Sequence, residues 1–410
     1  MNQELYDYLA NHYFYLNEGE FRHCTEKYGK EEFRWTIAEY VANERPAFPF
    51  RKMEYSDMVD TFRKLQKVDY TNFITPQEQL DNEVVEKYDD YKYEYQTCGQ
   101  GIIDGPTVYN LCSDYFMNHL RLGCGSYSYM APAQVWEQGT AKQIWSSIGG
   151  LWRGVNSTKD LSEKSIMEVL RLGTYIATQF KPIVAKTIYN MTDAKTVLDT
   201  SMGWGDRLAG FYASNATHYI GCDPNPYTFD VYSQMISEYN KLAPGKTTQI
   251  YRCGAEDLPW DSIENVDCAF TSPPYFSTEQ YNKGGQFEED QSWAKFNEYE
   301  KWRDEFYLPV AQNSFDSLSD NGVLLVNILD PKVKGKRYYS GNELVDSMRN
   351  DFMGQLGMRI MQRPKSDTLF KDDKEKAEFM NKMFIENVWC FGPETDLFKN
   401  SRVATLEDFF

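Results

Sequence analysis

Short β-rich runs alternate with helical stretches along the second half of the chain, and this alternation constrains the fold more than any other feature. Five such runs follow two predicted helices, Lys164–Leu172 and Pro182–Met191: Thr196–Asp199, Tyr219–Asp223, Thr248–Arg252, Val266–Phe270 and Gly322–Leu329. Strands that alternate with helices predict a parallel sheet with helices on both faces. Two later runs, Met358–Gln362 and Ile385–Phe391, predict a closing hairpin. We therefore expect an α/β fold with a doubly wound, mostly parallel sheet of seven strands.

The first 160 residues carry no repeat and no motif that we can name. They have a mainly helical pattern with acidic, aromatic-rich faces. The polar stretch Glu83–Tyr95 predicts a surface helix or a connector, and Asp104–Pro106 predicts a turn into a helix that runs through Arg121. A chain of 410 residues exceeds one average domain. We expect a mainly helical accessory region at 1–160, with target recognition as its candidate role, and a catalytic domain at 161–410.

Composition narrows the class of protein. No apolar run approaches the roughly 18 residues that span a bilayer, and the first 20 residues lack the pattern of an export signal. The eight cysteines include no C-x-x-C pair, and the spacing of Cys98, Cys112, His119 and Cys124 matches no common zinc pattern. We expect a soluble, cytoplasmic protein with reduced thiols and no metal.

A glycine turn follows the first β-rich run. The segment Val197–Leu208 is predicted to be a strand that ends at Asp199, a turn with Gly203 and Gly205, and the start of a helix. Glycines at such a turn let a cofactor approach the backbone closely. A purely structural turn explains two glycines equally well, because the third glycine of the dinucleotide fingerprint is missing.

Two acidic side chains follow the next two predicted strands. Asp223 ends the second run, about where doubly wound folds place an acid that binds ribose hydroxyls. Asp257 follows the third run and is able to accept a hydrogen bond from an adenine amino group. Each acid alone is as readily a solvated surface residue. Their order on successive strand ends favours a nucleotide-type cofactor.

The fourth run leads into Thr271–Tyr275, with the sequence Thr-Ser-Pro-Pro-Tyr. Two prolines fix the backbone and donate no hydrogen bonds, so carbonyl groups are left beside a hydroxyl and an aromatic ring. An amino nitrogen conjugated to a base ring is a poor nucleophile. Ser272 and the Pro273 carbonyl are suited to accept its two protons, while Tyr275 stacks on an extruded base. A turn or a docking peptide is the alternative for Pro273–Tyr275 taken alone.

Together these motifs resemble the S-adenosylmethionine-dependent amino-methyltransferases that modify DNA. The resemblance covers roughly residues 170–395 and implies S-adenosylmethionine as cofactor, a Rossmann-like methyltransferase sheet, and Ser272, Pro273, Pro274 and Tyr275 as the catalytic loop. The implied cofactor-binding residues are Thr178, Phe180, Asp199, Gly203, Gly205, Asp223, Asp257 and Thr271. Thr178 and Phe180 belong to a segment, Thr178–Ala185, that resembles the one closing over the methionine end of the cofactor.

Serine at the head of the loop is similar to enzymes that methylate cytosine at N4, whereas aspartate or asparagine is commoner in those that methylate adenine at N6. The variants Gly203–Leu208 and Thr271–Phe276 resemble those of bacteriophage-encoded members, so we expect a phage or bacterial origin. The chain departs from restriction-linked enzymes in having no obvious target-recognition domain after its catalytic half.

Four cations follow the fifth predicted strand, at Lys332, Lys334, Lys336 and Arg337. Doubly wound enzymes bind ligands at this end of their strands, so these cations are candidates for phosphate contacts. A solvated loop is the alternative. With Tyr275 and Phe276, they are the substrate-binding residues that we predict.

The net charge of −18 argues against an extensive basic surface for duplex DNA. DNA with a flipped base is the partner that we expect. RNA, a modified base or a free nucleotide stays open as the acceptor, as does a catalytically vestigial protein that binds the cofactor and a partner.

Overall fold

The computed structural model describes residues 2–76, 85–86, 101–281, 283–360, 370–381, 383–393 and 397. The chain divides into two compact units. The first unit comprises Met1–Tyr55, Met117–Gln179 and Gln280–Glu288, and the second comprises Ser56–Phe116, Phe180–Glu279 and Glu289–Phe410. This division differs from the expected boundary at residue 160, because segments from both sides of that residue contribute to each unit.

The first unit is helical. Its helices are α1 (Gln3–Asn11), α2 (Glu18–Tyr28), α3 (Lys30–Glu44), α6 (Pro132–Gln138), α7 (Ala141–Ser147) and α8 (Glu163–Gly173). Their apolar faces share one core, in which Phe33 and Ile37 of α3 are buried with Trp136 of α6 and Leu170 of α8. The helix α8 lies beyond residue 160 but packs in this core, which is why the expected boundary does not hold there.

The second unit is built on a sheet. Among the described residues its strands are β1 (Ile74–Pro76), β2 (Val85–Glu86), β3 (Gly101–Ile103), β4 (Thr196–Asp199), β5 (His218–Cys222), β6 (Thr247–Tyr251), β7 (Val266–Thr271), β8 (Leu318–Asn327), β11 (Phe352–Arg359) and β12 (Met383–Phe391). The order across the sheet is β1-β3-β11-β12-β8-β7-β4-β5-β6, and β2 pairs with the start of β12. The separate strands β9 (Lys332–Val333) and β10 (Lys336–Arg337) form a small antiparallel hairpin.

Strands β6, β5, β4, β7 and β8 are parallel to one another, and β12 is antiparallel to both of its long neighbours, β8 and β11. The expected doubly wound, mostly parallel sheet is therefore confirmed. The five runs predicted between Thr196 and Leu329 are strands to within a few residues, whereas β11 begins at Phe352 and not at the predicted Met358. The closing pair β11–β12 is antiparallel as predicted, although residues 361 and 362 of the predicted hairpin lie outside the described residues.

The sheet has more strands than the sequence predicted. Strand β3 adds to it in parallel beside β11, and β1 adds antiparallel beside β3. These strands come from residues 74–103, which were expected to belong to the N-terminal region, so the sheet draws on both parts of the chain. Of the stretch Glu83–Tyr95, only Val85 and Glu86 are described, and they form β2.

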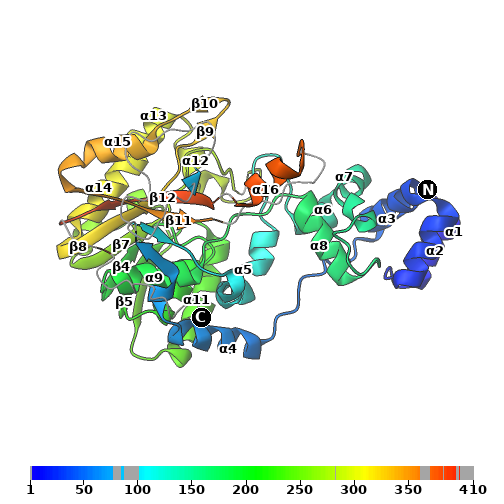
Figure 1. Cartoon of the computed structure of the whole chain (residues 1–410), viewed down its shortest axis with the longest axis horizontal. Helices are drawn as coiled ribbons and strands as arrows, with labels where there is room; N and C mark the ends of the chain where they lie inside the picture. Colours follow the sequence, from blue (N-terminus) through cyan, green and yellow to red (C-terminus); the bar gives the residue numbers. More distant parts are fainter. Residues whose placement is uncertain are drawn as a thin grey trace. The chain divides into compact units, whose positions relative to one another are not determined.

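Helices cover both faces of the sheet (Figure 1). The remaining helices are α4 (Tyr55–Lys67), α5 (Leu111–Leu122), α9 (Pro182–Met191), α10 (Asp206–Ala213), α11 (Pro226–Leu242), α12 (Ser292–Lys295), α13 (Tyr299–Trp302), α14 (Leu308–Asp316), α15 (Ser340–Ser347) and α16 (Asp373–Asn381). On one face, Tyr189 of α9 lies edge-on to Phe270 of β7, and Phe211 of α10 contacts Tyr219 of β5.

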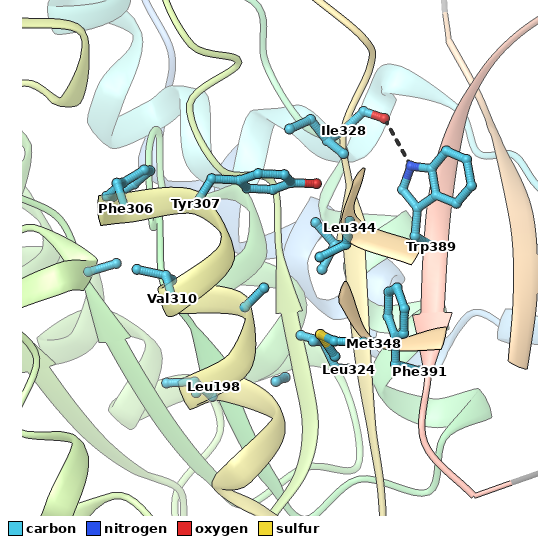
Figure 2. Packing of buried hydrophobic residues seen from close by; sticks show 14 of the residues in the cluster. Leu198, Phe306, Tyr307, Val310, Leu324, Ile328, Leu344, Met348, Trp389 and Phe391 are labelled. Atoms are coloured by element: carbon cyan, nitrogen blue, oxygen red, sulfur yellow. Dashed lines mark hydrogen bonds between the residues drawn. The ribbon is translucent and has the colours of Figure 1, made fainter. Parts of the chain in front are cut away.

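The other face packs against α14 and α15. Figure 2 shows Val310 of α14 and Leu344 of α15 beside the strand residues Leu198 and Leu324. Trp389 of β12 closes this core and donates a hydrogen bond from its indole nitrogen to a backbone carbonyl beyond the end of β8, at 3.4 Å. Burial of apolar side chains on both faces explains why these strands have nearly continuous hydrophobic runs.

The sheet changes winding direction between β4 and β7. From β4 the chain adds β5 and then β6 on one side, whereas β7 and then β8 lie on the other. The loops that leave the carboxyl ends of β4 and β7 therefore diverge around one point. Open α/β sheets bind their ligands in the crevice at such a point.

Candidate active site

The turn after β4 requires its glycines. Gly203 has φ of 55° and Gly205 has φ of 75°, a left-handed conformation that other residues adopt at a cost. Gly205 directly precedes α10. The Gly203 backbone N–H donates to the Asp223 carboxylate at 2.9 Å. The glycine turn is thus fixed to the carboxyl end of the neighbouring strand β5.

Asp199 is buried at the end of β4, and protein groups occupy its carboxylate. It accepts hydrogen bonds from Arg207 Nε at 2.9 Å, from the Tyr219 hydroxyl at 2.6 Å and from the Ser201 backbone N–H at 3.1 Å. Burial disfavours the charged form of Arg207 and lowers its pKa. The attraction of the adjacent Asp199 carboxylate is stronger than this effect, so the pKa of Arg207 is raised above its ordinary value. The predicted cofactor contact at Asp199 is therefore an internal ion pair that holds the loop.

Asp223 presents a fixed, partly exposed carboxylate. One oxygen accepts from Gly203, and the other accepts from the Asn225 backbone N–H at 3.0 Å and the Thr228 hydroxyl at 3.3 Å. Burial raises the pKa of Asp223 to about 6, although these hydrogen bonds oppose the rise. The carboxylate is held in one orientation at the strand end, where the sequence predicted it.

After β6, two neighbouring acids have different environments. The Asp257 side chain is 62% exposed and pairs with Lys295 at 3.3 Å. The Glu256 side chain is only 15% exposed and pairs with the same lysine at 2.8 Å. Its Oε2 atom is buried and has no hydrogen-bond partner within the described part of the chain. The carboxylate occupies the space that a Cβ atom on Gly254 would fill. Glu256 is thus the more enclosed acid at this strand end.

The loop after β7 is hydrogen-bonded to the loop after β4. The Thr271 hydroxyl lies 2.8 Å from the hydroxyls of both Thr200 and Ser201. Ser201 also hydrogen-bonds to the Ser272 carbonyl at 2.8 Å. The predicted catalytic loop and the glycine turn, 70 residues apart in sequence, are therefore held together at the point where the sheet changes direction.

Beyond this anchor, Pro273 is buried and Pro274 is exposed. The Ser272 hydroxyl lies 3.3 Å from the Tyr275 hydroxyl, which donates toward Glu386 Oε2 at 3.3 Å and toward Asn327 Oδ1 at 3.4 Å. Burial raises the pKa of Tyr275 well above its ordinary value, so this phenol is neutral near neutral pH. A serine, a tyrosine and a carboxyl group therefore form one polar cluster.

Glu386 was not predicted from the sequence. It lies on β12, and burial raises the pKa of its carboxyl group to about 7, while the donors Asn327 and Tyr275 oppose that rise. The available signal was an acid inside the largely apolar strand Met383–Phe391, since a charged residue is rarely buried without a partner. No sequence pattern indicated that β12 would bring it to the loop after β7.

Three predicted residues lie in other surroundings. Phe276 is 4% exposed and packs edge-on against Tyr299 at 5.5 Å, so its ring belongs to the core and not to an open substrate surface. Phe180 lies 5.6 Å from Phe270, and the Arg207 guanidinium is 5.4 Å from its ring. Thr178 is exposed and belongs to the first unit.

The predicted cations lie on the β9–β10 hairpin. Lys332, Lys334 and Lys336 are exposed. Lys336 lies 4.4 Å from the Tyr338 ring. Arg337 is partly buried and donates to the Asp330 carbonyl at 2.8 Å, so it also supports the base of the hairpin. The cations follow β8, as predicted, whereas the hairpin that carries them was not predicted.

Within the described ranges, no cluster of histidine, cysteine or acidic side chains has the arrangement of a metal site. Nor does any described helix have the length and apolar character needed to cross a membrane.

No protein-family model and no curated protein matches the sequence. The chain is similar to several solved structures. One is an rRNA methylase from Streptococcus thermophilus, at 12% identity over 53% of this chain and 100% of that one, with a TM-score of 0.31. Another is a putative RNA methyltransferase from Pyrococcus horikoshii, at 13% identity, 49% and 76% coverage, and a TM-score of 0.28. A methyltransferase from Podospora anserina bound to S-adenosylhomocysteine covers 37% of this chain and 53% of its own, at 13% identity and a TM-score of 0.25.

Proposed function

We propose that this protein is an S-adenosylmethionine-dependent methyltransferase that modifies the exocyclic amino group of a base in DNA, with cytosine N4 favoured over adenine N6. One observation carries the proposal. The Thr271–Tyr275 loop leaves β7 at the point where the sheet changes direction and is hydrogen-bonded there to the glycine turn. An acceptor-rich loop and a cofactor-type turn thus lie side by side at the carboxyl ends of neighbouring strands.

The described residues fit the cofactor at three strand ends. The turn at Gly203 gives close access to the backbone, because a Cβ atom there would meet only the Ser201 carbonyl at 3.7 Å. Asp223 is oriented to accept ribose hydroxyls. At the end of β6, the unpaired Oε2 of Glu256 is suited to accept from the adenine amino group, beside the predicted Asp257. The cofactor supplies an electrophilic methyl group on a sulfonium.

The loop supplies the acceptors that an amino nucleophile requires. The lone pair of an exocyclic amino nitrogen is delocalised into the base ring. Hydrogen bonds to the Ser272 hydroxyl and the Pro273 carbonyl localise it on nitrogen and fix its direction, which is catalysis by orientation. The Tyr275 ring then stacks on the base. A base inside a duplex has to be extruded before its amino group reaches such a loop.

The exposed lysines of the β9–β10 hairpin are proposed to contact the DNA backbone, and the helical first unit to assist target recognition. A bacteriophage or bacterial origin, and with it a cytoplasmic location, remains an expectation from the sequence resemblance. The serine at position 272 is the reason for favouring cytosine.

The test is to incubate the protein with labelled cofactor and unmodified DNA, digest the DNA to nucleosides and identify any methylated base. N4-methylcytosine is the expected product. Ser272→Ala should lower the rate about 100-fold, the usual scale for removing one positioned hydrogen-bonding group. Thr278→Ala is a matched control, because Thr278 is exposed on the same loop. Absence of any methylated nucleoside on diverse DNA would refute the proposal.

The net charge of −18 favours a second candidate, in which the same site acts on RNA, a modified base or a free nucleotide. Duplex binding displaces counterions and weakens steeply as salt rises, whereas binding of a nucleotide responds little. Activity measured from low to high salt on DNA, RNA and nucleotides therefore separates the two candidates.

A further inference from the structure

Glu386 is placed where a reaction at the Thr271–Tyr275 loop would release a proton. It reaches the loop from β12, and three side chains line up in hydrogen-bonding order: Ser272, Tyr275 and Glu386. The Tyr275 hydroxyl lies 3.3 Å from the Ser272 hydroxyl and 3.3 Å from Glu386 Oε2. Such contacts are long, as is common for catalytic groups before substrate binds. The carboxyl group is held toward Tyr275 by Asn327, whose Nδ2 donates to Glu386 at 3.4 Å and to the Asn387 carbonyl at 3.1 Å.

Amino methylation requires a proton acceptor. The amino nitrogen forms a bond to the methyl carbon while the bond from carbon to sulfur breaks, and that electron pair stays on sulfur. The nitrogen then carries the methyl group, both original hydrogens and a positive charge, so one proton has to leave. Ser272 and the Pro273 carbonyl accept hydrogen bonds but are too weakly basic to retain a proton, and Tyr275 already carries its own.

We propose that Glu386 takes up this proton through the hydroxyl groups of Ser272 and Tyr275. As the amino proton moves to Ser272 Oγ, the serine proton moves to the Tyr275 oxygen and the tyrosine proton moves to Glu386 Oε2. The relay ends with both hydroxyls neutral, Glu386 protonated and the methylated amino group neutral. The inference rests on the proposed amino-methyltransferase function and assigns to β12 a role in that same site.

The surroundings of Glu386 determine when it can act. The titratable groups that influence it are Tyr275 and the carboxylate of Glu279, which repels its negative charge. Its other polar neighbour, Asn327 of β8, is uncharged, and Met358 of β11 stands opposite it in the ladder. With a pKa of about 7, Glu386 is ionised above neutral pH. At such pH values it also releases an accepted proton readily. Only the ionised form can accept, so the rate should rise with pH through this value.

The experiment measures single-turnover methyl transfer as a function of pH in the full-length protein. Wild type should show a rise centred near pH 7 and a plateau above it. Glu386→Gln keeps the size and one acceptor of the side chain but cannot take a proton. It should lower the plateau rate about 100-fold, the lower end of what a positioned acid or base contributes, and should remove the rise. Binding of S-adenosylhomocysteine should be unchanged.

Glu279→Gln is the matched control. It also replaces a carboxyl group with an amide. Burial is the main cause of the raised pKa of Glu386, and Glu279→Gln removes only the repulsion that adds to it. The plateau should be kept while the rise shifts to lower pH. A purely structural role for Glu386 would not produce that shift.

Tyr275→Phe tests the relay and remains informative if Glu386→Gln does not fold. It keeps the aromatic ring but removes the hydroxyl that links Ser272 to Glu386. It should flatten the pH profile as Glu386→Gln does, and the double variant should be little slower than either single variant. Independent, multiplying effects would overturn the relay.

Failure of this inference differs from failure of the proposed function. If wild type methylates a base and Glu386→Gln keeps the same rate and pH profile, the inference is wrong while the function stands. If wild type methylates no nucleic acid or nucleotide, the function is wrong. The ionisation of Glu386 can then still be followed by infrared difference spectra against Glu386→Gln, and a carboxyl group that ionises near pH 4 would contradict its assignment.

Discussion

Arg207 and Asp199 form a buried ion pair in which each side chain neutralises the charge of the other. Both side chains are almost fully enclosed, and Arg207 also hydrogen-bonds to the Ser201 carbonyl. Replacing Asp199 by asparagine leaves the guanidinium buried without its counter-charge. Because such a loss is much larger than the net value of an intact pair, we expect the free energy of unfolding to fall by about 3–5 kcal/mol.

Denaturant unfolding of Asp199→Asn measures this loss, with Glu238→Gln as the control. Glu238 pairs with Lys241 at 2.6 Å on the surface, where the lysine side chain is 62% exposed. An exposed pair contributes at most about 1 kcal/mol. Equal costs for the two variants would show that Asp199 does not neutralise Arg207 in the folded protein.

Asp223 predicts a pH dependence of cofactor binding. Its pKa is about 6, and only the ionised form can accept hydrogen bonds from ribose hydroxyls while it accepts those from Gly203 and Asn225. Affinity for S-adenosylhomocysteine should therefore be constant above pH 7 and fall below pH 6, by up to about tenfold per pH unit. Calorimetric titration at several pH values measures it. Asp230→Asn, at an exposed position on α11, should follow wild type, whereas Asp223→Asn should bind weakly with no such pH dependence.

At the scale of elements, the turn between β4 and α10 is the connection in the proposed cofactor site that is most sensitive to substitution. Gly203 has a positive φ, so Gly203→Ala should destabilise the fold by about 1 kcal/mol. It should also weaken binding of S-adenosylhomocysteine, because the backbone N–H that orients Asp223 shifts. Gly154→Ala is the control, since a Cβ atom at Gly154 meets nothing within 4 Å. Thermal unfolding and calorimetry of both variants test the difference.

The sequence was sufficient to predict the central strands, because β4, β5, β7 and β8 are short apolar runs bounded by turn residues. It was insufficient for β1 and β3, which have only three residues each. They are strands because partners are available for pairing: β3 pairs with the long strand β11, and β1 pairs with β3. A pairing partner distant in sequence leaves no local pattern. The same reason explains why α8, predicted as a helix, could not be assigned to the correct unit.

For the proposed site, the sequence predicted the position of a residue where that position depends on its own loop, and not where it depends on packing. Gly203 and Asp223 lie at strand ends as expected, and Thr271 and Ser272 are bonded to the glycine loop. Asp199 and Phe276 were interpreted as ligand contacts, but one is sequestered by an arginine and the other by aromatic rings. Glu386 was missed because only the antiparallel return of β12 brings it to Tyr275.

At the scale of the whole molecule, the proposed binding of DNA by a protein with a net charge of −18 requires that its positive charge be concentrated in a small area. The β9–β10 hairpin is the proposed area. We expect the double variant Lys334→Gln and Lys336→Gln to weaken DNA binding and to lower the slope of log affinity against log salt, by nearly one for each phosphate that it no longer neutralises. The variant Lys64→Gln and Lys67→Gln removes two exposed lysines from α4 as a matched control. Equal slopes for both variants would exclude the hairpin as a phosphate-binding element.

The interleaved division of the chain also has a consequence for biosynthesis. Ile102 of β3 pairs with Gly357 of β11, so β3 leaves the ribosome long before its pairing partner is synthesised. The first unit is likewise incomplete until residues 280–288 emerge. Neither unit can therefore finish folding before these later segments are synthesised, and contacts of such long sequence separation form slowly. A fragment that starts at residue 161 would lack β1 and β3, and the edge of β11 that β3 covers would be open to pairing with other chains.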